Sequence, residues 1–204
     1  MSYYCGIDLG GTNIKAGIVD GEGKLLNKLS IKTNADRAME DIIHDMGQLA
    51  SDAIKDAGLE IKDIECIGIG SPGTPDNDEG LLVYSSNLPF NKAPMRKLIR
   101  EVVDLPVYID NDANCAAMAE AVAGAAKGAK DSVTITLGTG VGAGVIVNGR
   151  IFSVSQLLQQ VTTTDSVLMR LRRQSSQSSS VMSCLQFLML SRMTSLTRAQ
   201  RRRS

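Results

Sequence analysis

Short apolar segments separated by glycine-rich turns open the chain. The segments Tyr3–Asp8, Ile14–Val19 and Leu25–Lys32 have the length and composition of strands, and turns at residues 10–11 and 20–23 separate them. Consecutive strands joined by such short turns normally pair with each other. The pattern therefore predicts an antiparallel meander.

The next segment of the chain has the apolar periodicity of an α-helix. Between Asp36 and Ala57 the apolar residues recur at steps of three and four, which places them on one stripe of a helix, and Gly58 is a typical helix terminator. The members of the stripe are Met39, Ile42, Ile43, Met46, Leu49, Ala53, Ile54 and Ala57. His44 lies off this stripe, so we expect it at the surface.

Strands and helices alternate further along. We predict helices at about residues 94–103 and 113–126, a hairpin-like stretch after a Ser-Pro-Gly turn at residues 71–73, and strands at Cys66–Gly70, Pro106–Asp110, Ser132–Leu137 and Val141–Val147. This order predicts an α/β fold with a mixed sheet. The opening meander argues against the alternating βαβ order of a dinucleotide-binding fold.

The chain changes character near residue 150. All 19 glycines and all five prolines precede it, whereas residues 150–204 contain 12 serines, nine arginines and one acidic residue. Residues 1–149 carry a net charge of −8 and residues 150–204 one of +8. We therefore place a domain at residues 1–150 and an atypical Ser/Arg-rich tail at residues 151–204, which we expect to be disordered. A basic interaction tail, a divergent subdomain and a tail translated out of frame are three alternative explanations.

Other features favour a cytoplasmic protein. No apolar run approaches the roughly 20 residues of a membrane span, and no basic stretch precedes an apolar segment at the N-terminus. The four cysteines, Cys5, Cys66, Cys115 and Cys184, are far apart and are read as reduced thiols.

Two glycine-rich loops suggest a phosphate site. Asp8-Leu9-Gly10-Gly11-Thr12 joins the first two strands, and residues 137–144, Leu-Gly-Thr-Gly-Val-Gly-Ala-Gly, join two later ones. Glycine lets backbone N–H groups approach a phosphate closely, and Asp8 could hold a water of a bound Mg²⁺. Each loop alone could be a plain turn. The pair resembles the phosphate clamp of the actin-like ATPase and sugar kinase superfamily.

The segment Asp110-Asn111-Asp112-Ala113-Asn114 lies between these loops, where a strand leads into a helix. A carboxylate there could accept the proton of a hydroxyl that attacks a γ-phosphate. The alternative is a helix N-cap, for which Asp and Asn are favoured. A cap needs one such residue, whereas this segment has four, so a functional role is favoured.

Five linked motifs resemble the ROK family of sugar kinases over residues 3–152, and residues 107–147 are most similar to its glucokinases. The motifs are Asp8–Thr12 with Lys15, Ser71-Pro72-Gly73, Asn87-Leu88-Pro89, Asn111–Asn114 and Gly138–Gly144. The resemblance implies an actin-like ATPase (ribonuclease H-like) fold, use of ATP and Mg²⁺, and a small sugar as substrate. It implies no nucleic-acid or membrane partner, and homo-oligomers among full-length relatives.

The resemblance also implies residue roles. Asp112 would be the catalytic base, and the sugar would contact Gly73, Ser86, Asn87, Asn111 and Asp112. The ATP phosphates would contact Asp8, Gly10, Gly11, Thr12, Lys15, Gly138, Thr139 and Gly140, with Asp8 also serving the metal.

The chain departs from the family pattern after Phe152. Family members continue into a Glu-x-Gly-His motif that holds the sugar and a cysteine cluster that often binds zinc; the tail has no Glu, no His and one Cys. The leading hypothesis is phosphorylation of a hexose, D-glucose first, with N-acetylmannosamine, fructose and allose as other substrates of the same motifs. A sugar-responsive regulator is disfavoured because the phosphate motif begins at Asp8. A non-catalytic fragment is the third hypothesis.

Overall fold

A five-stranded mixed sheet forms the centre of the computed structural model, which describes residues 1–85, 88–137 and 141–152. Its strand order is β3-β2-β1-β4-β8, and the strands are β1 (Tyr3–Leu9), β2 (Asn13–Asp20), β3 (Leu25–Lys32), β4 (Ile64–Ser71) and β8 (Val107–Asn111). The first three pair antiparallel, whereas β4 runs parallel to both β1 and β8. The predicted meander and mixed sheet are therefore confirmed.

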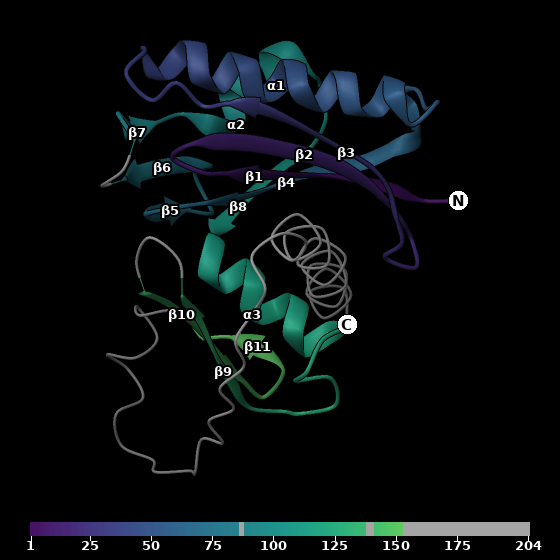
Figure 1. Ribbon diagram of the computed structural model, residues 1–204, viewed down its shortest axis with the longest axis vertical. Coiled ribbons are helices and arrows are strands. Elements are labelled where there is room, and N and C mark those ends of the chain that lie inside the picture. The colour runs from purple at the N-terminus through teal and green to yellow at the C-terminus, as the bar shows by residue number, and fades with distance from the viewer. Residues whose placement is uncertain (86–87, 138–140, 153–204) are drawn as a thin grey trace, which may run out of the picture.

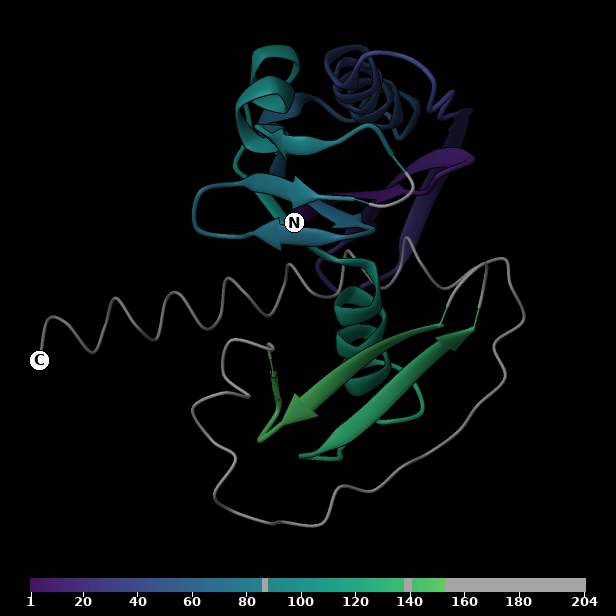
Figure 2. The ribbon, with the colours of Figure 1, turned by 90° about the vertical axis from the view of Figure 1, so that its left-hand side faces the viewer.

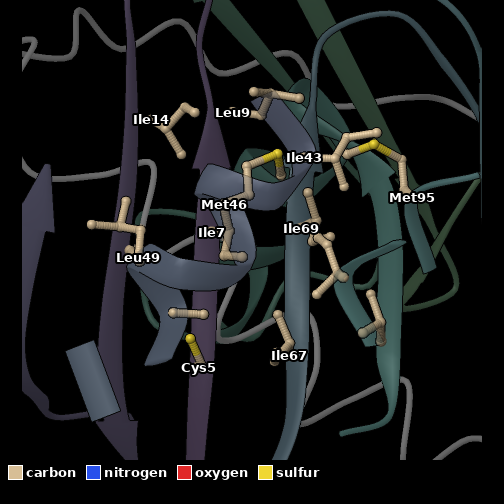
Figure 3. Close-up of a cluster of buried hydrophobic side chains, with 14 of the residues drawn as sticks. Cys5, Ile7, Leu9, Ile14, Ile43, Met46, Leu49, Ile67, Ile69 and Met95 are labelled. Carbon is tan, nitrogen blue, oxygen red and sulfur yellow. The ribbon is translucent and has the colours of Figure 1, made fainter. Parts of the chain in front are cut away.

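Two helices cover one face of this sheet (Figure 1). They are α1 (Met39–Asp56) and α2 (Met95–Val102). The predicted stripe of α1 packs on β1, β2 and β3. Ile43 and Met46 of this stripe lie close to Ile7 and Ile69 (Figure 3). Gly47 allows α2 to approach α1, because a Cβ there would lie 2.7 Å from Cβ of Val102.

A second, three-stranded sheet flanks β8. It consists of β5 (Thr74–Asp76), β6 (Leu81–Tyr84) and β7 (Asn91–Ala93), in the order β5-β6-β7. Arg96 of α2 fastens the β5–β6 turn to the main sheet, since its guanidinium donates to the carbonyls of Asn77, Asp78 and Val107. A 3₁₀ helix, Ile61–Asp63, precedes β4.

The last described elements lie on the opposite side of the main sheet from α1 and α2 (Figures 1 and 2). The helix α3 (Asp112–Val122) packs against a third sheet of β9 (Ser132–Leu137), β10 (Val141–Val147) and β11 (Arg150–Ile151). Gly142 and Gly144 let the helix lie close to β10, because a Cβ at Gly144 would be 2.5 Å from Cβ of Ala117.

Element ends account for most differences from the predicted pattern. The helix α1 begins at Met39 instead of Asp36, since Asn34 has φ 48° and a turn precedes the helix. The helix α3 ends at Val122 instead of residue 126. Ala123 leaves helical geometry, and the Glu120 carboxylate accepts the N–H of Ala125. The short strands β7 and β11 were not predicted.

Several smaller predictions can be compared with the described part of the chain. His44 is exposed as expected, and Cys5, Cys66 and Cys115 are buried. No helix there is long and apolar enough to cross a membrane. The tail was predicted to start at residue 151, but Ile151 belongs to β11. Residues 153–204, including Cys184, lie outside the described residues.

Candidate functional site

Three parallel strands end at one edge of the main sheet and bring separate motifs together. Asp8 of β1 pairs in register with Gly70 of β4, which pairs with Asp110 of β8. The next step along the same ladder pairs Ser71 with Asn111. Carboxyl ends of parallel strands are the common place for ligand sites in α/β proteins. The fold therefore gathers at this edge residues that lie about 100 positions apart in sequence.

The first glycine loop leaves this edge directly after β1. Gly10 donates its N–H to the carbonyl of Asn13 at 3.1 Å, and a Cβ on Gly10 would lie 2.8 Å from the same oxygen. Asp8 and Lys15 face each other across β1 and β2, with Lys15 Nζ 3.3 Å from Asp8 Oδ2. The base of the loop thus carries an ammonium group that is paired with a carboxylate.

Asn111, and not Asp112, is the N-cap of α3. Its Oδ1 accepts the N–H groups of Ala113 at 2.9 Å and Asn114 at 3.4 Å, while its Nδ2 donates to the carbonyl of Gly73 at 3.0 Å. Gly73 has φ +103°, and a Cβ there would lie within 3.0 Å of Tyr84 and Ser85 backbone atoms. The N-cap alternative therefore applies to Asn111, which also ties the loop after β4 to the start of α3.

Asp112 is left at the first position of α3, next to the cap. Asp112 is exposed to solvent, yet desolvation by the surrounding protein raises the pKa of its carboxyl, and the nearby Asp8 carboxylate raises that pKa further. The N–H of Ala113, which donates to Asp112 Oδ1 at 2.9 Å, acts in the opposite direction. A carboxylate with an elevated pKa is a suitable proton acceptor for a hydroxyl.

Asp110 stabilises this segment by accepting hydrogen bonds. It is buried, and burial raises the pKa of its carboxyl, an effect opposed by hydrogen bonds from Asn114, the Asn111 N–H and Asn77. Asn114 Nδ2 donates to Asp110 Oδ1 at 2.9 Å. The sequence singled out this cluster of four polar residues, but it did not reveal that Asp110 and Asn114 hold the backbone while Asp112 faces the site.

Other predicted site residues lie outside the described ranges. Ser86 and Asn87 of the predicted sugar side and Gly138, Thr139 and Gly140 of the second glycine loop belong to this group. The flanking strands β9 and β10 do form the antiparallel hairpin that this loop was predicted to join.

The carboxylates of this edge are its residues that could bind a metal ion. The described part of the chain contains no group of three or more His, Cys, Asp and Glu side chains that could hold a metal ion. Mg²⁺ that travels with a nucleotide needs only one or two protein carboxylates, because phosphates and water fill its other positions. The predicted metal role of Asp8 is of this kind and stays a prediction.

Comparison with known proteins identifies the family. The model of the ROK family matches residues 4–156, which is more than half of the chain. The chain therefore belongs to the ROK family, and the earlier resemblance is confirmed.

Several of the similar proteins are glucokinases or hexokinases of this family. A glucokinase from Halalkalibacterium halodurans is 36% identical over 149 residues, which cover 73% of this chain and 45% of the relative. The structure of a ROK glucokinase from Streptomyces griseus, solved with glucose and AMPPNP, has a TM-score of 0.67 at 33% identity and covers 74% of this chain and 46% of that one. A ROK hexokinase from Thermus thermophilus has a TM-score of 0.64 at 37% identity, with 74% and 48% covered. The predicted actin-like fold is confirmed.

Other relatives have different activities. A xylose repressor from Caldicellulosiruptor bescii is 30% identical over 72% of this chain and 37% of its own length, and an N-acetyl-D-glucosamine kinase from Citrobacter koseri is 34% identical over 72% and 47%. The chain thus spans about half the length, or less, of the relatives it matches.

Proposed function

We propose that the whole protein is an ATP-dependent hexose kinase that converts D-glucose to glucose 6-phosphate, and that this chain carries the base and part of the phosphate site. The glucokinase relatives support the choice of glucose. The nucleotide and glucose bound by the Streptomyces griseus protein support the choice of substrates. Residues 1–150 form the proposed kinase domain, which β11 (Arg150–Ile151) and the family match to residue 156 extend by a few residues. The rest of the Ser/Arg-rich stretch up to residue 204 is proposed to be a tail unrelated to it.

The position of Asp112 beside Asp8 carries the proposal. Asp112 follows the cap of α3, where its carboxylate is exposed to solvent while desolvation by the surrounding protein and the charge of Asp8 raise its pKa. It accepts the proton of the sugar hydroxyl while the hydroxyl oxygen bonds to the γ-phosphorus and the bond to the ADP oxygen breaks. Asp8 at the neighbouring strand end belongs to the phosphate side of the same edge.

The phosphate side is built from the two glycine loops. Backbone N–H groups at Gly10, Gly11 and Thr12 would bind phosphate oxygens, and the Lys15 ammonium would balance their charge. Gly138, Thr139 and Gly140 complete the proposed clamp. Asp8 would hold Mg²⁺ through water, and the ion would withdraw charge from the phosphates.

On the sugar side of the proposed site, Asn111 is the residue whose hydrogen bonds are described. One hydrogen of Nδ2 is donated to Gly73, which leaves the second hydrogen for a sugar hydroxyl. Gly73, Ser86 and Asn87 are proposed to line the same side. Because relatives act on different sugars, a panel of glucose, fructose, N-acetylmannosamine and N-acetylglucosamine is the direct test of specificity.

The substitution Asp112→Asn tests the base. In a full-length version, with the sequence after residue 152 restored from another reading frame, loss of a general base is expected to lower kcat about 10²–10⁴-fold while glucose affinity changes little. The measurement is ATP-dependent glucose phosphorylation together with glucose binding by calorimetry. Asp104→Asn is the matched control, since Asp104 is an exposed carboxylate that follows α2 and whose ion pair in the described part of the chain is with the exposed Arg100. Near-normal turnover of Asp112→Asn rules Asp112 out as the base.

The fragment hypothesis requires a second comparison. Because the chain spans 45% of the glucokinase relative, the 204-residue chain is assayed beside the restored version. Equal activity in the two proteins would contradict the proposal that this chain carries only part of the site.

A further inference from the structure

Thr33, which belongs to none of the sequence motifs, forms hydrogen bonds to the first glycine loop. Thr33 directly follows β3 and is fully buried. Its hydroxyl donates to the carbonyl of Gly10 at 2.6 Å, and its N–H donates to the carbonyl of Thr12 at 3.0 Å. One buried side chain and its own amide therefore fix both ends of the loop.

These bonds set the direction of the loop's donors. In a trans peptide the carbonyl of one residue and the N–H of the next point to opposite sides. Since the Gly10 carbonyl is turned toward Thr33, the Gly11 N–H is directed away from Thr33. A loop that was not held could turn this peptide over and present a carbonyl oxygen, which repels a phosphate.

Thr33 is itself anchored to the helical layer. Its carbonyl accepts Arg37 Nη2 at 3.2 Å, and the same nitrogen lies 2.7 Å from Asp45 Oδ2 of α1. Asp45 of α1, Arg37, Thr33 and Gly10 are thus connected in this order by the Arg37–Asp45 ion pair and by hydrogen bonds.

We propose that Thr33 is a positioning residue of the phosphate site, whose hydroxyl holds the Gly10 peptide so that the Gly11 N–H faces a bound polyphosphate. This inference rests on the proposed function, because it needs the loop to bind phosphate. Thr33 contacts no substrate in this role and acts only through the loop.

The test compares variants that differ by one group. Thr33→Val keeps the branched shape but removes the hydroxyl and leaves the Gly10 carbonyl without this donor, whereas Thr33→Ser keeps the hydroxyl. Ser30→Ala is the matched control, since Ser30 Oγ also donates to a carbonyl, that of Ile14, but one removed from the loop. Amide spectra of every variant confirm that it is folded.

Two measurements on the 204-residue chain decide the outcome: calorimetric binding of tripolyphosphate with Mg²⁺, and ¹⁵N order parameters of residues 10–12. We expect Thr33→Val to bind about tenfold more weakly and to lower the order parameter of Gly11. Thr33→Ser and Ser30→Ala should stay within about threefold of the wild type.

The failures can be told apart. Unchanged binding and an unchanged Gly11 order parameter in Thr33→Val overturn the inference alone. A wild-type chain that does not bind tripolyphosphate overturns the phosphate site of the proposed function, and the inference with it.

Discussion

At the scale of single residues, Asp8 and Asp112 place two negative charges near each other at one sheet edge. Lys15 lies 3.3 Å from Asp8, whereas Asp112 is stabilised by the N–H of its neighbour Ala113. Desolvation and the repulsion from Asp8 therefore raise the pKa of Asp112. Such unequal environments are how a site keeps one carboxylate as the better base.

We predict that the carboxyl of Asp112 titrates above its ordinary value of 3.8 in the folded chain, and that Asp8→Asn lowers its pKa by removing the repulsion. Carbon-13 NMR of the side-chain carboxyls across pH measures both effects. The kinase activity that depends on Asp112 as a base should therefore fall as the pH falls through this raised pKa. An Asp112 pKa that does not move in Asp8→Asn would contradict the coupling.

The same shift has a consequence for stability. Above the unfolded pKa the folded state retains a proton that the unfolded state has lost, so Asp112 lowers the free energy of unfolding as the pH rises through that window. Asp112→Asn should remove this part of the pH dependence, even though it abolishes the base.

A second prediction at this scale concerns Gly11. In Gly11→Val a β-branched side chain would keep phosphate from the backbone amides, so we expect affinity for ATP to fall about tenfold or more while glucose affinity changes little. Separate calorimetric titrations of the restored full-length protein with each ligand measure this. Gly21→Val is the control, since a Cβ at Gly21 meets nothing closer than 3.6 Å. Equal loss of both affinities points to a folding defect instead.

At the scale of elements, glycines decide how closely α3 approaches β10. A Cβ on Gly144 would lie 2.5 Å from the carbonyl oxygen of Ala113 and from Cβ of Ala117. The helix carries Asp112 at its first position, so this packing also supports the candidate site. Helix and hairpin are thus fixed together by small residues.

Gly144→Ala is predicted to lower the free energy of unfolding by about 1–3 kcal/mol, because the added methyl group pushes α3 away from the strand. Urea denaturation measures the change. Ala143→Val adds volume to the same strand on its exposed face, and it should have an effect below about 0.5 kcal/mol. If the two variants are equally stable, the close contact is not what holds α3.

Sequence patterns predicted these elements well because each strand or helix has its own local period. The strands Leu25–Lys32, Ser132–Leu137 and Val141–Val147 were predicted with the residues observed. Which of residues 110–114 caps the helix and which are structural could not be predicted. These roles depend on contacts from Gly73 and Asn77, which are distant in sequence. Thr33 was missed for the same reason: a lone threonine after a strand has no sequence pattern of its own.

At the scale of the whole molecule, the described chain leaves one sheet face apolar. Gly142, Gly144 and Ile146 of β10 point toward α3, and β-strand alternation places the intervening residues on the opposite face. The outward residues of the hairpin are Val133, Ile135, Leu137, Val141, Ala143, Val145 and Val147. Leu137 is 71% exposed and Val141 is 78% exposed. Contiguous apolar surface of this kind favours association.

We therefore predict that the 204-residue chain self-associates through this face as its concentration rises. The pair Leu137→Thr and Val141→Thr keeps strand propensity while removing apolar area from opposed positions of β9 and β10. Because burying one large apolar side chain stabilises an interface by about 1.5–3 kcal/mol, the double variant should weaken association at least tenfold, about 1.4 kcal/mol. Sedimentation velocity over a concentration series measures the change. Val83→Thr, on the partly exposed strand β6, serves as the control and should behave as the wild type. If the double variant has the same concentration-dependent mass as the wild type, association occurs elsewhere, and the hairpin face is not the surface that joins the copies.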